Sequence, residues 1–500
     1  MSSTAHPADA AGALPLPPDA QATRGRLPLR VKTLFSIGDI VDGTVTYGVA
    51  IFLFYYLTAV CGMSGATAGT ILVLSTVIDG VADPFVGSIS DNTNARLGRR
   101  LPYMFASGLP TALAFGLIFS IPAFPPGWML ALYAGVVLLA LRLATSFFFL
   151  PYASLSAELS DDYTERSFVF AYRTFFNCVG NIILLVLGYW VFMRGHEGLL
   201  DRGAYAAFGW TIAAVALAAS LISAFGALPQ LPQLRRLNVP TQFGLRQLVR
   251  ELTEVFQARS FLSLFLSTLL FWTSAGLAAT LGVHANLYFW KLPDEVVATL
   301  PLVNIAGFVA GLPLSAYLTH RFEKREVALI GLFATCGVQF VAAPLAILGV
   351  LPTGTALHII LGAIAFAGGM AGTCAFVAWG SMMSDAVDEH ELLFGSRREG
   401  VYFAGLTVSI KAATGIGGLL AGLSLDIIGF PSDLANADLA AIAPATLDAI
   451  GIVQGPVAGL LGIGGVILLR RYRIDRKELA RIQAELAARA EAAAAGGVRA

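Results

Sequence analysis

Two aspartates four residues apart, Asp79 and Asp83, lie in an otherwise apolar stretch of the sequence. On a helix this spacing places both carboxylates on one face, with their Cβ atoms about 5–6 Å apart. Two negative charges at that distance repel each other, so the pair favours a bound cation or a shared proton. We therefore predict a cation site here, which is a metal site if the cation is sodium. An ion pair with a neighbouring arginine at a helix end is the alternative, although the stretch contains no arginine of its own.

Three more ionisable residues, Asp42, Arg142 and Lys411, interrupt apolar stretches elsewhere in the chain. Charged groups within a membrane are costly and are normally retained for function. A buried arginine such as Arg142 needs a carboxylate partner or an anionic ligand. Asp42 either faces a central cavity or lies near the membrane surface at the start of its helix. Lys411 either contacts the substrate or forms an ion pair with Asp79 or Asp83 from the other half of the chain.

Two groups of charged residues follow the predicted fourth and tenth spans. We predict that they latch the two halves of the molecule together in an outward-facing state and separate in the inward-facing one. The alternative is that they form solvated loops. The candidate gating residues are Glu158, Asp161, Asp162, Asp385, Asp388, Arg397 and Arg398.

The elements that must hold these residues are indicated by composition. Of the 500 residues, 56% are hydrophobic and only 13% are charged, whereas a soluble chain carries about 25% charged residues. The apolar residues recur in runs long enough to cross lipid, which takes roughly 20 residues per helix. Backbone groups inside lipid must pair within their own segment, which favours helices. We predict an all-α membrane protein with twelve spans, at 34–60, 66–90, 101–122, 128–155, 168–193, 204–228, 260–290, 297–319, 326–350, 355–384, 400–428 and 450–470.

A polar, proline-containing stretch between the sixth and seventh spans divides the chain into halves. Lys and Arg concentrate in alternate loops, and the positive-inside rule then places both termini in the cytoplasm, with the chain in a bacterial inner membrane. The predicted domains are a disordered cytoplasmic tail, a six-helix bundle, a cytoplasmic linker, a second six-helix bundle, and a cytoplasmic helix with its tail. Their ranges are 1–32, 33–228, 229–259, 260–470 and 471–500.

Several function classes lack support in the sequence. The four cysteines are scattered singly, which argues against a zinc site or a disulfide framework. We find no Walker loop and no nucleophile with a positioned base, so we expect no enzyme and no cofactor apart from a coupling proton or sodium ion. The net charge is zero and the basic residues lie at helix ends, which argues against a nucleic-acid partner. We expect a monomer whose partners are lipid, a small solute and a monovalent cation or proton.

Four stretches between residues 33 and 480 resemble one transporter family. The chain is similar there to the glycoside–pentoside–hexuronide:cation symporters, the melibiose-permease-like branch of the major facilitator superfamily. The stretches are Phe54–Ser64, Asp79–Gly87, Leu150–Leu159 and Asp385–Gly400. The resemblance implies a major facilitator fold with two bundles of six helices and transport by alternating access.

The resemblance also implies roles for individual residues. In that family, aspartates that match Asp79 and Asp83 bind the coupling cation, and a hydroxyl that matches Ser146 assists them. Substrate contacts come from positions that match Arg173, Lys411 and Phe376.

The chain departs from the family pattern around the expected sugar site. A first-helix aspartate of the melibiose branch falls on Gly43, next to Asp42, and a fourth-helix aspartate falls on Phe149. The loss of carboxylates that accept sugar hydroxyls argues against a melibiose-like sugar. An amide beside the cation site falls on Ala82, which favours a proton over sodium as the coupling ion.

The basic residues Arg142, Arg173 and Lys411 suit an anionic or zwitterionic solute, such as a hexuronide or a lysophospholipid. We predict cation-coupled symport of a glycoside, pentoside or hexuronide by alternating access. Uniport or export of an amphiphile and a non-transporting membrane sensor are the alternatives.

Overall fold

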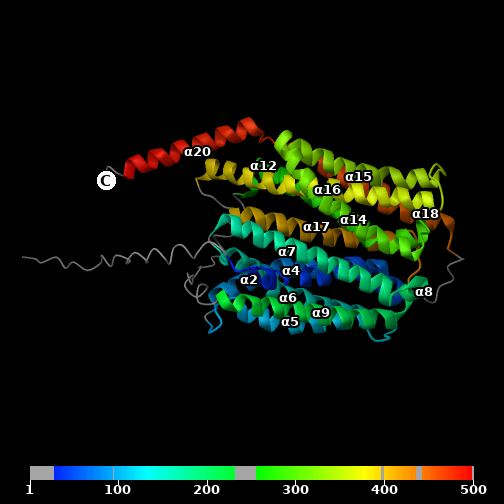
Figure 1. The fold of residues 1–500 in the computed structure, drawn as a ribbon. Coiled ribbons are helices and arrows are strands. Elements are labelled where there is room, and N and C mark those ends of the chain that lie inside the picture. Colours follow the sequence, from blue (N-terminus) through cyan, green and yellow to red (C-terminus); the bar gives the residue numbers. More distant parts are fainter. Residues whose placement is uncertain are drawn as a thin grey trace, which may run out of the picture.

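The computed structural model describes residues 27–93, 95–160, 162–230, 255–395, 399–434 and 442–497. In these ranges every regular element is a helix. Twelve of the helices are long and apolar enough to cross a membrane, and they run side by side along one common direction (Figure 1). The predicted all-α membrane fold with twelve spans is therefore confirmed.

The first half of the chain supplies six spans. The first contains α2 (Leu29–Ser36) and α3 (Asp39–Val41), and three π-helical turns prolong it, at Asp42–Thr46, Val49–Leu53 and Tyr56–Val60. The others are α4 (Gly65–Asn92), α5 (Leu101–Phe119), α6 (Trp128–Glu158), α7 (Tyr163–Leu185), which a π-helical segment (Val186–Phe192) continues, and α9 (Arg202–Ala227) with a 3₁₀ turn (Leu228–Gln230). The short helix α8 (Gly195–Leu200) lies between α7 and α9.

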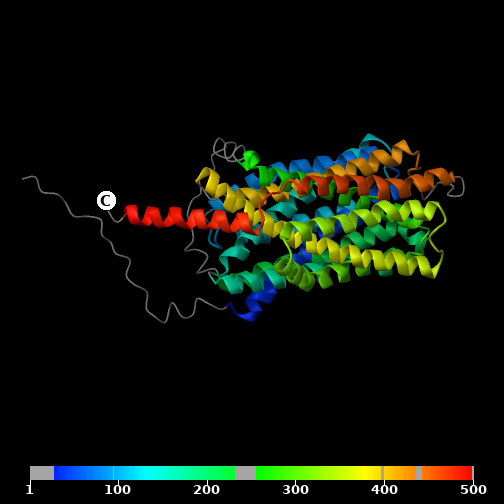
Figure 2. The same ribbon diagram turned by 90° about the horizontal axis from the view of Figure 1, so that it is seen from above.

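The second half supplies six more. The seventh span is α12 (Arg259–Thr280), followed by α13 (Gly282–His284) and a π-helical turn (Ala285–Phe289). The next four are α14 (Asp294–Arg321), α15 (Lys324–Ile347), α16 (Thr355–Phe394) and α17 (Glu399–Ile427), and the last joins α18 (Pro444–Ile452), a π-helical turn (Val453–Val457) and α19 (Ala458–Leu469). The final helix is α20 (Arg476–Gly497). Both views show the helices of each half packed beside one another, with α20 projecting from one end of the bundle (Figures 1 and 2).

Residues 1–26, 231–254 and 498–500 lie outside the described residues, and they include most of the predicted tail and linker. Helix boundaries elsewhere follow capping signals more closely than hydropathy. Asp162 caps α7 by accepting hydrogen bonds from the backbone N–H groups of Thr164 and Glu165, at 2.6 and 3.2 Å. The span predicted to start at 168 therefore starts earlier. In the same way α16 continues past the apolar run and ends where Gly395 adopts a φ of +73°.

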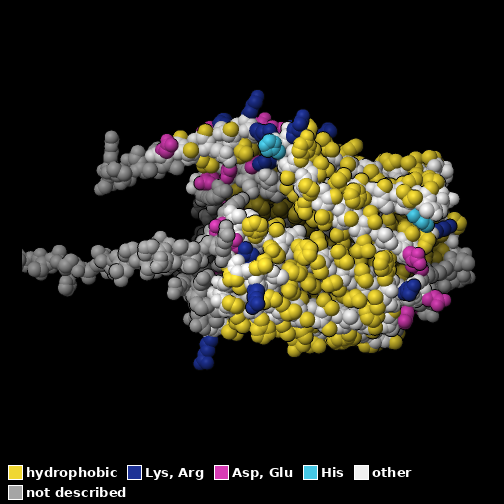
Figure 3. Space-filling model, in the orientation of Figure 1, with side chains coloured by type: hydrophobic (Ala, Val, Ile, Leu, Met, Phe, Trp, Pro, Cys, Tyr) yellow, Lys and Arg dark blue, Asp and Glu magenta, His cyan; other side chains and the backbone are white. Residues whose placement is uncertain are grey.

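The two halves meet closely along α4 and α17. A Cβ atom on Gly69 would lie 2.8 Å from the carbonyl oxygen of Gly418, and one on Gly422 would collide with the carbonyl of Gly65. Because these positions lack side chains, the two backbones approach far enough to carry residues of both halves to one site. Figure 3 shows a broad band of hydrophobic side chains across the visible face of the bundle, with charged residues toward its two ends.

Candidate cation and substrate site

Asp79 and Asp83 lie on one face of α4 and turn toward Ser146 of α6. The Ser146 Oγ lies 2.6 Å from Asp79 Oδ1 and 2.8 Å from Asp83 Oδ1. A hydroxyl group has one proton to donate, so it satisfies only one of these two contacts when both carboxylates are ionised. The second contact calls for a proton on one carboxylate or for a cation between the oxygens. The three side chains therefore form one cluster of oxygen atoms, and the binding of a cation by them remains a prediction.

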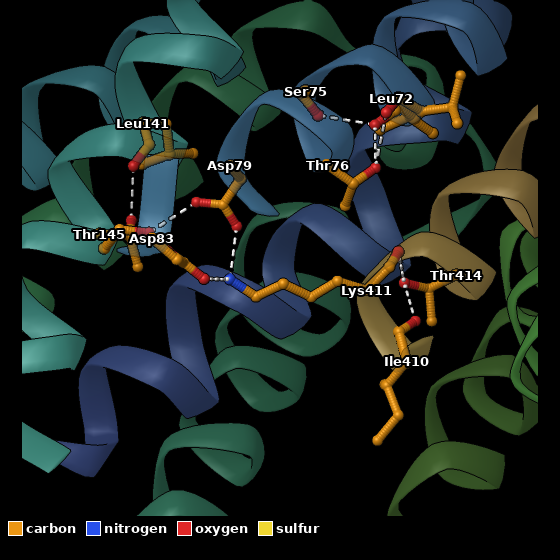
Figure 4. Close-up of polar contacts among 12 residues, drawn as sticks. Leu72, Ser75, Thr76, Asp79, Asp83, Leu141, Thr145, Ile410, Lys411 and Thr414 are labelled. Atoms are coloured by element: carbon orange, nitrogen blue, oxygen red, sulfur yellow. Dashed lines mark hydrogen bonds and ion pairs between the residues drawn. The ribbon is translucent and has the colours of Figure 1, made fainter. Parts of the chain in front are cut away.

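Lys411 reaches this cluster from α17, in the other half of the molecule (Figure 4). Its Nζ lies 2.8 Å from Asp79 Oδ2 and 2.5 Å from Asp83 Oδ2. The side chain of Asp79 is 4% exposed, that of Asp83 19% and that of Lys411 30%. This is the ion pair that the sequence offered as one of two roles for Lys411. We call Asp79, Asp83, Ser146 and Lys411 the bridging cluster, because its contacts join the two halves.

The residues of α4 next to the bridging cluster do not compete for its contacts. The hydroxyls of Ser75 and Thr76 bond back to the carbonyl of Leu72, at 2.8 and 2.7 Å, which satisfies them within the helix (Figure 4). Pro84 follows Asp83 directly and has no N–H to donate to the carbonyl of Gly80. In the described part of the chain no three or more His, Cys, Asp or Glu side chains group as metal ligands.

Arg142 lies on α6, one helical turn before Ser146. It makes no ion pair or hydrogen bond with any residue that the structure describes, and its Nε is buried without an acceptor. Its charge interacts with those of Asp79 and Asp42. Asp42 accepts a hydrogen bond of 3.0 Å from Asn177 Nδ2, on α7. Arg142 is therefore a partly buried cation with hydrogen-bond donors that no described residue satisfies, an arrangement that an anionic ligand would complete.

Arg173 contacts protein partners in this structure, and a contact with substrate remains a prediction for it. Its Nε lies 2.6 Å from Asp39 Oδ2, and its guanidinium stacks 4.5 Å above the ring of Tyr152. The Tyr152 hydroxyl donates to the same Asp39 oxygen at 2.8 Å, and Arg173 Nη1 donates to Ser156 at 2.9 Å. All of these residues belong to the first half of the chain, so we call them the N-half cluster. In this structure Arg173 is held by protein partners, whereas Arg142 is not.

The remaining substrate candidate, Phe376 on α16, has a ring that is 48% exposed. Nearby Trp379 is buried and packs edge-on against Phe271, so the two aromatic residues differ in role. Contact with a substrate remains a prediction for Phe376.

The ion pairs that the structure describes for the gating candidates lie within one half of the molecule. Glu158 forms ion pairs with Arg99 and Arg100, which follow α4. Asp385 forms one of 2.7 Å with Lys324, at the corresponding place in the second half. Asp162 caps α7 and Asp388 accepts a hydrogen bond from Gln483 of α20. The other candidates, Asp161, Arg397 and Arg398, lie outside the described residues. A latch between the halves remains a prediction for another state of the molecule.

The halves are instead joined at the end opposite the termini. The hydroxyls of Tyr55 and Tyr288 lie 3.0 Å apart, and Thr58 Oγ1 lies 3.3 Å from His284 Nε2. The carboxylate of Asp426 on α17 accepts hydrogen bonds of 2.8 and 2.9 Å from the first two backbone N–H groups of α4. We call these contacts the outer seal. At the other end Figure 3 shows a recess between the halves.

Sequence reasoning missed the outer seal. The aromatic residues that close the seventh span are typical of a membrane-interface belt, but Tyr288 is buried between the halves. No local signal pairs Tyr55 with Tyr288, or Asp426 with the start of α4. Each of these two contacts joins positions more than 230 residues apart.

Comparison with known proteins agrees with the fold. Residues 34–476 match the model of a family described as MFS/sugar transport protein. An uncharacterized symporter, sll1374 of Synechocystis sp. (strain ATCC 27184 / PCC 6803 / Kazusa), is 26% identical over 93% of this chain and 97% of its own. The glucuronide carrier protein homolog of Escherichia coli (strain K12) is 26% identical over 81% of this chain and 85% of its own. Among solved structures, the nucleoside transporter NupG has a TM-score of 0.60 at 12% identity and covers 88% of this chain and 98% of its own.

The match spans nearly all of the described residues and both bundles, including the bridging cluster. The chain therefore belongs to the MFS/sugar transport protein family, the glycoside–pentoside–hexuronide symporters, and is a multi-pass membrane transporter of the major facilitator type.

Proposed function

We propose that the protein couples uptake of an anionic sugar-like solute, such as a hexuronide, to a proton or sodium ion. The observation that carries the proposal is the ammonium of Lys411 lying between the carboxylates of Asp79 and Asp83. A positive charge from one half already occupies the place where a coupling ion would bind to the other half. The incoming cation and Lys411 then compete for the same oxygens, so cation binding changes the contact between the halves.

Charge balance explains why a cation is needed. Two ionised carboxylates and one ammonium leave the bridging cluster with one surplus negative charge, and an uncompensated charge is costly to enclose in a membrane. One monovalent cation or one proton neutralises the cluster and lets it be occluded during the change of state. The cation also weakens the hold of the two carboxylates on Lys411, whose ammonium stays beside the cluster and becomes available to the substrate, and this links the two binding events reciprocally.

Arg142 favours an anion among the family's solutes. A carboxylate on the substrate would give this partly buried guanidinium the bidentate partner that it lacks among the described residues. The relative named as a glucuronide carrier protein homolog supports a uronide in particular. Asp42, which accepts a hydrogen bond from Asn177, would also accept hydrogen bonds from hydroxyl groups of the same solute.

The test is uptake into proteoliposomes that contain the purified protein. Radiolabelled glucuronides, neutral glycosides and pentosides are offered under an imposed proton gradient, an imposed sodium gradient, or neither. We expect concentrative uptake of the uronide with one of the two gradients, and loss of that uptake in Arg142→Gln. Uptake that ignores both gradients contradicts the coupling, and uptake that is unchanged in Arg142→Gln contradicts the anionic substrate. A protein that binds solute but moves none is the sensor alternative.

A zwitterionic or anionic amphiphile such as a lysophospholipid is the second candidate. The recess between the halves opens on the hydrophobic band of the bundle (Figure 3), which would admit a ligand with an acyl chain. Exposed phenylalanines on α7, including Phe168, Phe170 and Phe175, would give such a chain an apolar surface. Competition separates the two candidates, because a lysophospholipid that is the cargo inhibits uptake at submicellar concentration and is itself moved between leaflets.

The orientation follows from the same proposal. With the termini in the cytoplasm of a bacterium, the outer seal faces the periplasm and the recess faces the cytoplasm. The structure then corresponds to an inward-facing state, in which bound solute and ion leave toward the cell interior. The proposal requires no cofactor and one protein molecule per transport unit.

A further inference from the structure

A dense group of basic side chains lies where the second half of the bundle leaves the hydrophobic band. Figure 3 shows Lys and Arg gathered where α20 meets the ends of α14 and α15. Three segments contribute to it: the end of α14, the start of α15, and the stretch between α19 and α20. We call this group the basic corner, and its exposed members are Arg321, Arg325, Arg470, Arg471, Arg473 and Lys477.

Hydrogen bonds to backbone carbonyls hold the three segments together. Arg325 Nη1 donates to the carbonyl of Tyr472 at 3.0 Å, which ties the start of α15 to the stretch before α20. Arg476 Nη2 donates to three carbonyls at the end of α14, those of Thr319, His320 and Phe322, at 3.1, 2.9 and 2.8 Å. These bonds satisfy the carbonyl groups that a helix leaves free at its end. The basic residues of separate helices are thereby fixed beside one another.

Buried side chains hold the backbone of the stretch between α19 and α20, and its arginines alternate with them on the outside. Tyr472 and Ile474 are buried, whereas Arg471 and Arg473 between them are exposed. The Tyr472 hydroxyl donates to the carbonyl of Met382 at 3.0 Å. Burial, together with the nearby Asp385 and Glu389, raises the pKa of Tyr472, so the phenol stays neutral and keeps its proton for this bond. The alternation fixes the backbone, and the two guanidinium groups project from it to the outside.

Charge within the corner is not balanced by acids. Lys324 is paired with Asp385, and Arg476 lies 3.8 Å from Glu323. The six exposed basic residues form no ion pair with any acid in the described part of the chain. The nearby acids without such pairs are Glu326 and Asp475, and the carboxylate of Asp475 caps α20 at the N–H of Glu478. A large positive surplus therefore remains exposed.

The corresponding corner of the first half is different. There Arg99 pairs with Glu158, and Arg100 pairs with both Asp91 and Glu158. The two corners occupy equivalent places in the two bundles, between the second and third helices of each. The requirement for positive charge on this side of the membrane applies to both. It does not explain why two of the three arginines in the first corner, Arg99 and Arg100, are paired with acids while the basic corner keeps six exposed basic residues without such pairs among the described residues.

We infer that the basic corner binds the phosphate headgroup of an anionic phospholipid of the adjacent leaflet. Its residues follow or precede three membrane spans directly, at Arg321, Lys324 and Leu469, so they lie at the depth of the lipid headgroups. Basic residues next to a span attract anionic lipid, and several of them around one position give a defined site. A bound lipid would hold α14, α15 and α20 together on the outside, as the hydrogen bonds do on the inside.

The experiment measures thermal unfolding of the purified full-length protein in neutral detergent with added lipid. Dioleoyl phosphatidylglycerol is compared with dioleoyl phosphatidylcholine, and inorganic phosphate at equal concentration shows whether free anion suffices. We expect phosphatidylglycerol alone to raise Tm, and 0.5 M NaCl to reduce the effect, because exposed charges are screened. Equal stabilisation by phosphatidylcholine or by inorganic phosphate would overturn the inference, and this comparison needs no variant.

The variant Arg471→Gln/Arg473→Gln identifies the site. Each basic residue contributes about a fivefold gain in affinity for an anionic surface, so the pair should weaken phosphatidylglycerol binding roughly 25-fold. The control Arg30→Gln/Arg96→Gln removes the same charge from exposed residues at the same end of the first half, and should keep the stabilisation. Arg471→Lys/Arg473→Lys should keep it too, since the charge remains. Loss in the control as large as in the variant overturns the assignment to this corner.

Discussion

The molecule holds two buried clusters of acid and base that look alike in composition and differ in what they join. In the N-half cluster, Arg173 and Asp39 are paired at 2.6 Å, and both belong to the first bundle. In the bridging cluster, Lys411 of the second bundle is paired with Asp79 and Asp83 of the first. When two bundles rock against each other, contacts within one bundle persist and contacts between bundles change. Only the bridging cluster can therefore sense or drive the movement, whereas the N-half cluster stabilises one moving part.

The largest effect should come from removing a carboxylate of the bridging cluster. In Asp79→Asn the cluster loses its surplus negative charge and no longer needs a cation to be enclosed. We expect gradient-driven accumulation to disappear, with a loss of cation dependence of roughly 5–150-fold, the usual range for coupling between sites. Uptake in proteoliposomes with and without the gradient measures it.

Solute exchange without a gradient is the internal control for Asp79→Asn, because it needs movement but no net coupling. It should survive in part. Accumulation that persists in the variant would show that the acid pair is structural and that the two clusters do not differ in the way proposed.

A substitution in the N-half cluster should lower the stability of the folded protein. Arg173→Ala leaves Asp39 as a buried charge without its partner, which costs about 3–5 kcal/mol. We expect a lower Tm and a lower folded yield, and partial recovery in Asp39→Asn/Arg173→Gln, where no charge is left unpaired. A stable Arg173→Ala protein with weakened substrate binding would instead support the substrate contact that the family resemblance implied.

Lys411→Ala tests the competition at the centre of the bridging cluster. Without the ammonium, the carboxylates offer their oxygens to an incoming ion unopposed, and apparent affinity for the coupling ion should rise roughly tenfold. Substrate should no longer tighten ion binding, because the group that links the two events is gone. Ion dependence of substrate binding measures both, and Lys411→Arg is the matched control. An unchanged ion affinity in Lys411→Ala would mean that Lys411 and the ion occupy different places.

Sequence predicted one cluster far better than the other for a physical reason. Asp79 and Asp83 are four residues apart on one helix, so their proximity follows from helical geometry alone. The spans were predictable because each contains its own apolar run. The partner of Arg173 lies 134 residues away, and that of Asp426 in the outer seal 360 residues away or more. Such contacts depend on how the helices pack, which no local pattern encodes.

The outer seal offers the smallest and most specific test of movement between the halves. Tyr288→Phe removes the hydrogen bond to Tyr55, which contributes about 0.5–1.5 kcal/mol, and so should raise the population opened at this end roughly two- to twelvefold. Cys61 is buried beside the seal, and its rate of labelling by a membrane-impermeant maleimide should rise by that factor. Tyr205→Phe is the control, since this buried hydroxyl forms no hydrogen bond with any described residue and belongs to the first bundle. Equal labelling rates in the two variants would mean that the Tyr55–Tyr288 hydrogen bond does not hold the halves together at this end. The α4–α17 contact and the Asp426 cap would then be the contacts that keep it closed.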